Sequence, residues 1–203
     1  MSKGYFLSGL WLVDFLLWVW YPLGRKYRLS SKERPRKQRG QGVNYTYGES
    51  PLRVLELINT HCSPKSGTVF MELGCGTGRL SFAAAMQYQM KALGVDAIPS
   101  FIRRAQRICR LLGRDDVHFV KGDLFDLDWS TADMLYITTT TFTEETLSRF
   151  HLKASEVKEG GWLISLTHPP KGEGWSLMNT VVVDCSWGVA TLFMSQKSTG
   201  TTP

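Results

Sequence analysis

The chain has 203 residues, which is enough for one domain with a full hydrophobic core and too few for two domains of ordinary size. Hydrophobic residues make up 43% and charged residues 21% of the chain, and this composition excludes a disordered protein. The formal net charge is +6, but residues 24–40 alone carry +7 and residues 41–203 carry −1, so a nucleic-acid-binding face on the main part of the chain is not expected.

The first predicted element is an apolar stretch over residues 5–23, YFLSGLWLVDFLLWVWYPL, in which Asp14 is the one charged residue. A helix of this length, at ~1.5 Å per residue, nearly spans a hydrocarbon core of ~30 Å. Aromatic residues at its C-terminal end and the basic run that follows are typical of a membrane interface and a cytoplasmic flank. We therefore predict that residues 1–23 anchor the protein in a membrane, that residues 24–44 are a basic linker, and that the folded domain faces the cytoplasm.

Two other interpretations of the same stretch remain. Asp14 lies in the middle of the apolar stretch and costs ~3 kcal/mol on insertion scales, which leaves open an aromatic helix that packs on the domain or lies in the membrane interface. A cleaved signal peptide is disfavoured because no small-residue cleavage site follows the apolar run.

From residue 45 onward, strand and helix patterns alternate, which is typical of a mostly parallel sheet with helices on both faces. The last two strands are separated by Ser186 and Trp187 and predict a β-hairpin. The sequence thus predicts an α/β, Rossmann-like domain over residues 45–197 and a flexible tail over residues 198–203. Strands are expected at 68–73, 91–96, 117–123, 132–138, 161–167, 178–185 and 188–196, and helices at 50–62, 79–88, 100–113 and 143–157.

A glycine-rich loop follows the first strand, in FMELGCGTGRLSFAAA from Phe70. Its pattern is Glu-x-Gly-x-Gly-x-Gly, with Glu72, Gly74, Gly76 and Gly78, whereas dinucleotide-binding proteins carry Gly-x-Gly-x-x-Gly. Glycine at every second position keeps side chains off a loop that runs close to a ligand. The negative charge of Glu72 would repel a pyrophosphate and favour a cationic sulfonium amino acid, so an NAD oxidoreductase is disfavoured.

Two further acidic residues follow the next two strands. Asp96 ends the second strand, at a position from which a carboxylate accepts hydrogen bonds from ribose hydroxyls, and Asp123 follows the third strand. The Asp123 side chain could accept from an adenine amino group, and Leu124 could supply a backbone N–H and an apolar contact. Open α/β sheets bind ligands at the carboxyl ends of their strands, so these residues predict a nucleoside site.

With these motifs, residues 68–195 resemble the class I, seven-strand S-adenosylmethionine-dependent methyltransferases. The resemblance implies a seven-stranded sheet whose C-terminal hairpin strand is antiparallel, and S-adenosyl-L-methionine as the cofactor. It also implies which residues bind that cofactor: Glu72, Gly74, Cys75, Gly76, Gly78, Asp96, Ala97, Asp123 and Leu124.

A narrower resemblance concerns two other segments. YTYGES (45–50) is similar to the Tyr-Gly-Glu segment of the DOT-like (disruptor of telomeric silencing), non-SET lysine methyltransferases, and DCSWGVATLF (184–193) looks like the hairpin of that group and of its small membrane-anchored relatives. This implies that Tyr47, Gly48 and Glu49 close over the methionine end of the cofactor. The chain departs from the histone enzymes at TTTTF (138–142), where those enzymes carry an Asn-Asn-Phe type of stretch.

Methyl transfer from a sulfonium requires a neutral nucleophile behind the methyl group and the exclusion of water. No Asn-Pro-Pro-Tyr-like stretch follows the fourth strand, which disfavours nucleobase or glutamine amide methylation. For a lysine, aromatic walls would favour the neutral amine by desolvation. We expect the walls of the substrate channel to include Tyr47, Phe142 and Trp187, with a hydroxyl of Thr139 or Thr140 near the methyl donor.

The sequence therefore favours a membrane-tethered methyltransferase that acts on a protein lysine. Methylation of a lipid, quinone or other small membrane molecule is an alternative, and so is an S-adenosylmethionine-binding protein without catalysis. The widely spaced Cys62, Cys75, Cys109 and Cys185 and the scattered histidines suit neither a metal site nor a disulfide scaffold, so no metal is expected. We expect a monomer whose partners are the membrane, through residues 5–23, and a protein or membrane-borne substrate.

Overall fold

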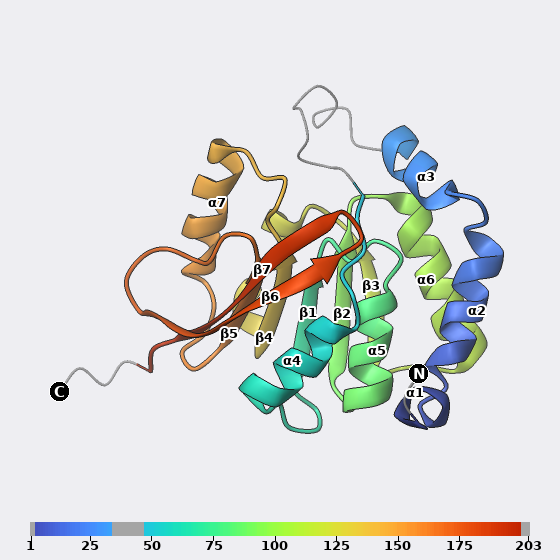
Figure 1. Ribbon diagram of the computed structural model, residues 1–203, viewed down its shortest axis with the longest axis horizontal. Helices are drawn as coiled ribbons and strands as arrows, with labels where there is room; N and C mark the ends of the chain where they lie inside the picture. The colour runs from blue at the N-terminus through green and yellow to red at the C-terminus, as the bar shows by residue number, and fades with distance from the viewer. Residues whose placement is uncertain (1–2, 34–46, 200–203) are drawn as a thin grey trace.

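A seven-stranded sheet forms the centre of the protein in a computed structural model that describes residues 3–33 and 47–199 (Figure 1). The strand order is β3-β2-β1-β4-β5-β7-β6; β1 to β5 are parallel, and β7 runs antiparallel to both β5 and β6. This confirms the predicted sheet with an antiparallel C-terminal hairpin. The strands are β1 Val69–Leu73, β2 Lys91–Asp96, β3 Val117–Lys121, β4 Met134–Thr138, β5 Trp162–Leu166, β6 Trp175–Cys185 and β7 Gly188–Lys197.

Alternate residues of the central strands supply two separate cores. In β4, Met134 and Tyr136 face one core and Leu135 and Ile137 face the other, as the two-residue period of a strand requires. The first core is shared with α4 (Arg53–Cys62), α5 (Arg79–Tyr88) and α6 (Pro99–Leu112), and the second with α7 (Glu144–Ala154). Both faces of the sheet are therefore covered, and the carboxyl ends of the parallel strands meet at one edge.

The predicted boundaries agree with the structure where residues that start or end a helix mark them in the sequence. The helix over Arg79–Tyr88 is the predicted one, and α6 begins at Pro99 and is closed by Gly113 in a left-handed conformation at φ +59°. The boundaries differ by up to three residues elsewhere: α4 begins at Arg53, α7 ends at Ala154, and β6 begins at Trp175 rather than at the expected Met178. A register shift between Leu177 and Asn179 interrupts its pairing with β7.

The N-terminal stretch forms three helices: α1 (Lys3–Leu7), α2 (Leu10–Trp20) and α3 (Arg25–Glu33). Gly9, at φ +77°, separates α1 from α2, because its left-handed backbone cannot continue a helix. The single helix expected over residues 5–23 is thus two helices that end at Trp20. Among residues 3–33 and 47–199, no helix is both long and apolar enough to cross a membrane.

Helices α2 and α3 pack on the domain, α2 against α5 and α3 against α6, and α1 packs on α2 (Figure 1, blue). Leu10, Val13 and Leu17 lie on one face of α2 and are buried. The segment expected to be a basic linker is thus helical over Arg25–Glu33. Residues 34–44 of that segment, Tyr45 and Thr46 of the YTYGES motif, and residues 200–203 of the predicted tail lie outside the described residues.

Candidate active site

A cavity of about 340 Å³ lies at the carboxyl ends of β1, β2 and β4. Its volume is in the range of small-molecule sites, and its position is the one at which open α/β sheets bind ligands. The cavity brings together most of the residues that the sequence singles out. These are Tyr47, Gly48, Glu49, Glu72, Gly74, Cys75, Gly76, Asp96, Ala97, Asp123, Leu124, Thr140, Phe142 and Trp187.

The glycine loop between β1 and α5 has positive φ angles at all three of its glycines. A Cβ on Gly74 would meet no atom within 4 Å, so this stretch of backbone faces open space in the cavity. Gly78 does not line the cavity. A Cβ on Gly78 would lie 2.4 Å from the Phe119 ring, and Gly78 precedes the first residue of α5. Gly74 therefore suits close approach of a ligand, whereas Gly78 is required by packing and by the start of the helix.

Glu72 is buried at the end of β1, and one of its carboxylate oxygens accepts hydrogen bonds from the backbone N–H and the hydroxyl of Ser81. Burial raises the pKa of Glu72 to about 8, although both bonds from Ser81 oppose the shift. The sequence predicts Glu72 to be a negative charge that selects a cationic ligand. Burial thus favours the protonated carboxyl in the free protein, and a cation bound beside it would favour the carboxylate.

Asp96 connects the end of β2 to the glycine loop. Its two carboxylate oxygens accept backbone hydrogen bonds, one from Gly76 N–H and one from Ile98 N–H, each at 2.8 Å. Burial raises the pKa of Asp96 to about 6, against the effect of these backbone bonds. A carboxylate oxygen can accept more than one bond, so Asp96 can hold the loop and still accept from a pair of hydroxyls.

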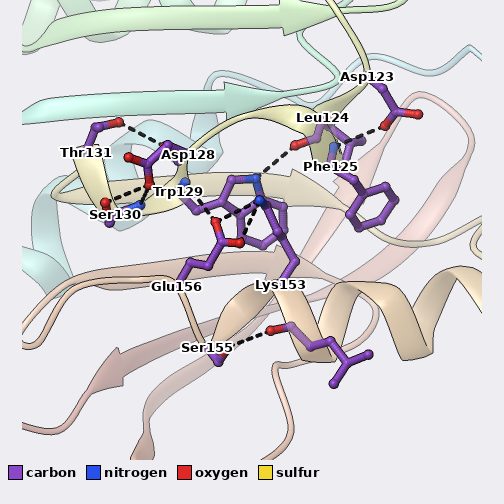
Figure 2. A network of polar contacts seen from close by, with 11 residues as sticks. Asp123, Leu124, Phe125, Asp128, Trp129, Ser130, Thr131, Lys153, Ser155 and Glu156 are labelled. Carbon is purple, nitrogen blue, oxygen red and sulfur yellow. Dashed lines mark hydrogen bonds and ion pairs between the residues drawn. The ribbon is translucent and has the colours of Figure 1, made fainter.

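The segment after β3 is held by a residue that the sequence did not single out (Figure 2). Oδ1 of Asp123 accepts from Phe125 N–H at 3.0 Å and begins the short 3₁₀-helix η2 (Leu124–Asp126). The indole of Trp129, in the 3₁₀-helix η3 (Trp129–Thr131), is fully buried and donates to the Leu124 carbonyl at 2.9 Å. Trp129 therefore positions Leu124 in the cavity wall. Its sequence context, DLDWS, carries no pattern that indicates this contact.

Residues 47–49 lie between the N-terminal helices, the glycine loop and the hairpin turn. The Tyr47 hydroxyl donates to Glu49 Oε1 at 2.6 Å, and the Tyr47 ring lies against Gly76, where an added Cβ would be 2.9 Å away. Burial and the neighbouring Glu49 raise the pKa of Tyr47 far above its usual range, so the phenol stays neutral. Lys26 of α3 forms an ion pair with Glu49.

The hairpin turn holds the same segment from the other side. The Glu49 backbone N–H donates to the Ser186 hydroxyl at 2.8 Å. Gly48 faces the Trp187 indole so closely that an added Cβ would lie 2.1 Å from its ring. Lys26 and Ser186 were not predicted to support the site, because only the tertiary structure brings α3 and the hairpin to this segment.

Thr139 does not take the predicted position in the channel. It is fully buried, its hydroxyl donates to the Leu166 carbonyl at 2.5 Å, and the same oxygen accepts from His168 N–H at 3.0 Å. Its neighbours Thr138, Thr140 and Thr141 line the cavity instead. Among residues 3–33 and 47–199, no group of three or more His, Cys, Asp or Glu could hold a metal ion.

Residues 64–165, half of the chain, match a family model described as a methyltransferase domain. No curated protein matches the chain in sequence.

Solved structures match the fold. An RNA methyltransferase from Salinibacter ruber in complex with S-adenosyl-L-homocysteine has 20% identity and a TM-score of 0.60, over 76% of this chain and 96% of that one. A magnesium protoporphyrin IX methyltransferase from Synechocystis with bound S-adenosyl-L-homocysteine has 17% identity and a TM-score of 0.59, over 72% and 82%. The [4+2]-cyclase SpnF has 13% identity and the same TM-score of 0.59, over 73% and 81%. Since these proteins differ in reaction and substrate, the likeness shows the fold and leaves the substrate open.

Proposed function

This chain belongs to the family of class I S-adenosylmethionine-dependent methyltransferase domains, and on that premise we propose that it methylates the side-chain amine of a protein lysine. The cofactor supplies an activated methyl group on a sulfonium. The protein has to position the acceptor and keep water away from it.

The residues of the cavity fit this cofactor. The open backbone at Gly74 suits the methionine part, and the Asp96 carboxylate suits the ribose hydroxyls. Asp123 and Leu124, which line the cavity after β3, suit the adenine amino group and ring. Glu72 suits the cationic end of the molecule. Burial disfavours an isolated carboxylate at this position, and a positive charge bound beside Glu72 would stabilise it.

The choice of acceptor rests on one observation: the acidic groups that line the cavity leave no general base for a hydroxyl acceptor. In this proposal three of the four carboxyl groups that line it, Glu72, Asp96 and Asp123, bind the cofactor, and the fourth, Glu49, accepts from Tyr47 and pairs with Lys26, so none is left as a general base. No histidine is among the described residues that line the cavity. A hydroxyl acceptor needs a general base, whereas an amine that arrives neutral does not.

The other lining groups support an amine. Tyr47, Phe142 and Trp187 supply aromatic rings that disfavour the charged ammonium by desolvation, and Thr138 and Thr140 supply hydroxyls. The connection between β5 and β6 covers only residues 167–174 and adds no domain over the site. An accessible cavity of this kind suits a side chain that belongs to a larger molecule.

The experiment follows methyl groups from labelled S-adenosylmethionine into hypomethylated membranes and lysate. Proteins are separated from an organic extract before counting, and labelled protein is hydrolysed and compared with methyllysine standards. Wild type should label a discrete protein band as methyllysine. Asp96→Ala should not label it, and Asp126→Ala, an exposed acid of the same loop that binds no part of the cofactor in this proposal, should behave as wild type.

Two other results would overturn the lysine proposal. Asp96-dependent label in the organic extract alone would identify a lipid, quinone or other small acceptor. Cofactor binding without any transferred label, in the presence of both fractions, would identify a binding protein without catalysis.

A further inference from the structure

The outer face of the N-terminal helices is apolar and exposed. In α2, Trp11, Phe15 and Trp18 have 44%, 55% and 73% of their surface exposed. Phe6 and Leu7 of α1 are 55% and 87% exposed. These five residues, with Val19 at 45%, are called here the aromatic face. Large exposed apolar clusters are unusual on a soluble domain and mark surfaces that bind something.

The orientation of this face is set by the packing of α2. Leu10, Val13 and Leu17 are buried, and α2 packs on α5. Trp11, Phe15 and Trp18 also recur at helical spacing, four and then three residues apart, and they are exposed, so they lie on a different face of the helix. The core therefore already uses one side of α2, which lies along the outer edge of the molecule (Figure 1), and the aromatic face is exposed.

Basic groups lie at the C-terminal end of α2 and in the helix that follows it. Arg25 and Arg28 of α3 are exposed, and the Arg107 guanidinium of α6 lies 5.4 Å from the centre of the Trp20 ring, at the C-terminal end of α2. Residues 24–40 together carry +7, while residues 41–203 carry −1. The positive charge of the protein is thus concentrated in the segment that follows the aromatic face.

We propose that the aromatic face docks on the surface of an anionic lipid bilayer. Tryptophan and phenylalanine side chains partition into the boundary between headgroups and acyl chains, and arginines beside them attract anionic headgroups. A second copy of the chain is a poorer occupant, because two copies that met through this face would bring their arginines together.

Docking at this face would place lipid next to helices that also support the active site. Arg79, which pairs with Asp14 of α2, and Ser30 of α3 both line the cavity. The lipid proposal does not depend on the identity of the methyl acceptor, so the two can fail separately.

The test measures co-sedimentation of the full chain with vesicles of phosphatidylcholine alone and of phosphatidylcholine mixed with phosphatidylserine. Wild type should bind the mixed vesicles and lose affinity as salt is raised. The double variant Phe15→Ser/Trp18→Ser should bind at least about tenfold more weakly, because two interfacial aromatic side chains are lost. Arg25→Glu/Arg28→Glu should lose the preference for phosphatidylserine.

A matched control tests whether any exposed apolar pair has the same effect. Leu177→Ser/Met178→Ser removes two residues of the hairpin that are 56% and 55% exposed, and this variant should bind vesicles as wild type does. Thermal melts should show that all variants keep the wild-type fold, since every changed residue is exposed. Absence of vesicle binding by wild type, or equal loss in the control, would overturn the proposal. So would a wild-type dimer in solution that Phe15→Ser/Trp18→Ser dissociates, because it would show that a second copy occupies the face.

Discussion

The Arg79 guanidinium forms a two-point ion pair with the Asp14 carboxylate, with Nε 2.6 Å from Oδ1 and Nη2 2.9 Å from Oδ2. The Tyr5 hydroxyl also donates to Asp14 Oδ2, at 2.5 Å. Burial opposes the ionisation of Asp14, but the bonds from Arg79 and Tyr5 outweigh it and lower the pKa of Asp14. The one acidic residue of the apolar stretch is thus the group that joins α2 to the first turn of α5, beside the glycine loop.

Breaking this pair should destabilise the protein. Asp14→Ala leaves the half-buried guanidinium of Arg79 without its partner, and we expect the free energy of unfolding to fall by about 2 kcal/mol. Chemical denaturation measures the change. Arg53→Ala removes the exposed Arg53–Glu56 pair and should change stability by less than about 1 kcal/mol. Equal effects of the two substitutions would show that the Asp14–Arg79 pair has no special role.

Glu72 should make the free protein less stable at alkaline pH. Its pKa is about 8 in the folded state and near the ordinary value of 4.5 in the unfolded state, so the folded state holds the proton more tightly. The stability from the protonated carboxyl is complete below the unfolded pKa and is lost as pH rises through the folded pKa, by on the order of 4 kcal/mol.

Denaturation from about pH 6 to about pH 9 measures the upper part of this loss, roughly half of it, and this window lies above the folded pKa of Asp96. Glu72→Gln has no proton to lose and should flatten the curve there. Asp96, whose folded pKa is about 6, should still make the stability of the Glu72→Gln variant depend on pH below about pH 6. A wild-type curve that is already flat above pH 6 would contradict the assignment to Glu72.

Asp96→Ala should abolish cofactor binding. The substitution removes the acceptor for the ribose hydroxyls and also releases Gly76 N–H and Ile98 N–H. Because hydrogen bonds to a charged group are lost, we expect the affinity for the cofactor to fall by at least about 100-fold. Titration calorimetry with S-adenosylhomocysteine measures it, with Asp126→Ala as the control. Unchanged affinity would remove Asp96 from the cofactor site.

Gly48→Ala should impair the site through Trp187. An alanine Cβ would meet the indole at 2.1 Å, so the ring or the 47–49 segment must move. We expect at least a tenfold fall in kcat/KM, about 1.4 kcal/mol, with the fold intact. Adding Trp187→Ala to Gly48→Ala removes the clash and tests the cause: if the clash alone is responsible, the double variant should be no worse than Trp187→Ala. Additive losses would contradict this account.

Several sequence predictions lie outside what the structure tests. The cytoplasmic orientation and the monomeric state stay predictions. The protein-lysine acceptor stays a proposal that rests on the groups lining the cavity. Among the residues predicted for the substrate channel, Tyr47 and Phe142 line the cavity and Thr139 does not.

The order of the strands and helices, the glycine loop and the acidic residues at the strand ends could be predicted from the amino-acid sequence. These features are local: strand and helix periods, Pro99, Gly113 and the run from Glu72 to Gly78 act over a few residues. Because parallel strands end at one edge, Glu72, Asp96 and Asp123 had to come together once the strands were placed.

The packing of the N-terminal stretch and the pKa shifts of the site depend on contacts between residues that are far apart in the chain. Asp14 and Arg79 are 65 residues apart, and no local pattern indicates that they pair. The orientation of neighbouring threonines could not be predicted either. The Thr139 hydroxyl donates to the Leu166 carbonyl, whereas Thr140 lines the cavity. Burial, which raises the pKa of Glu72, depends on every element packed around it and therefore cannot be read from the residues beside it in the chain.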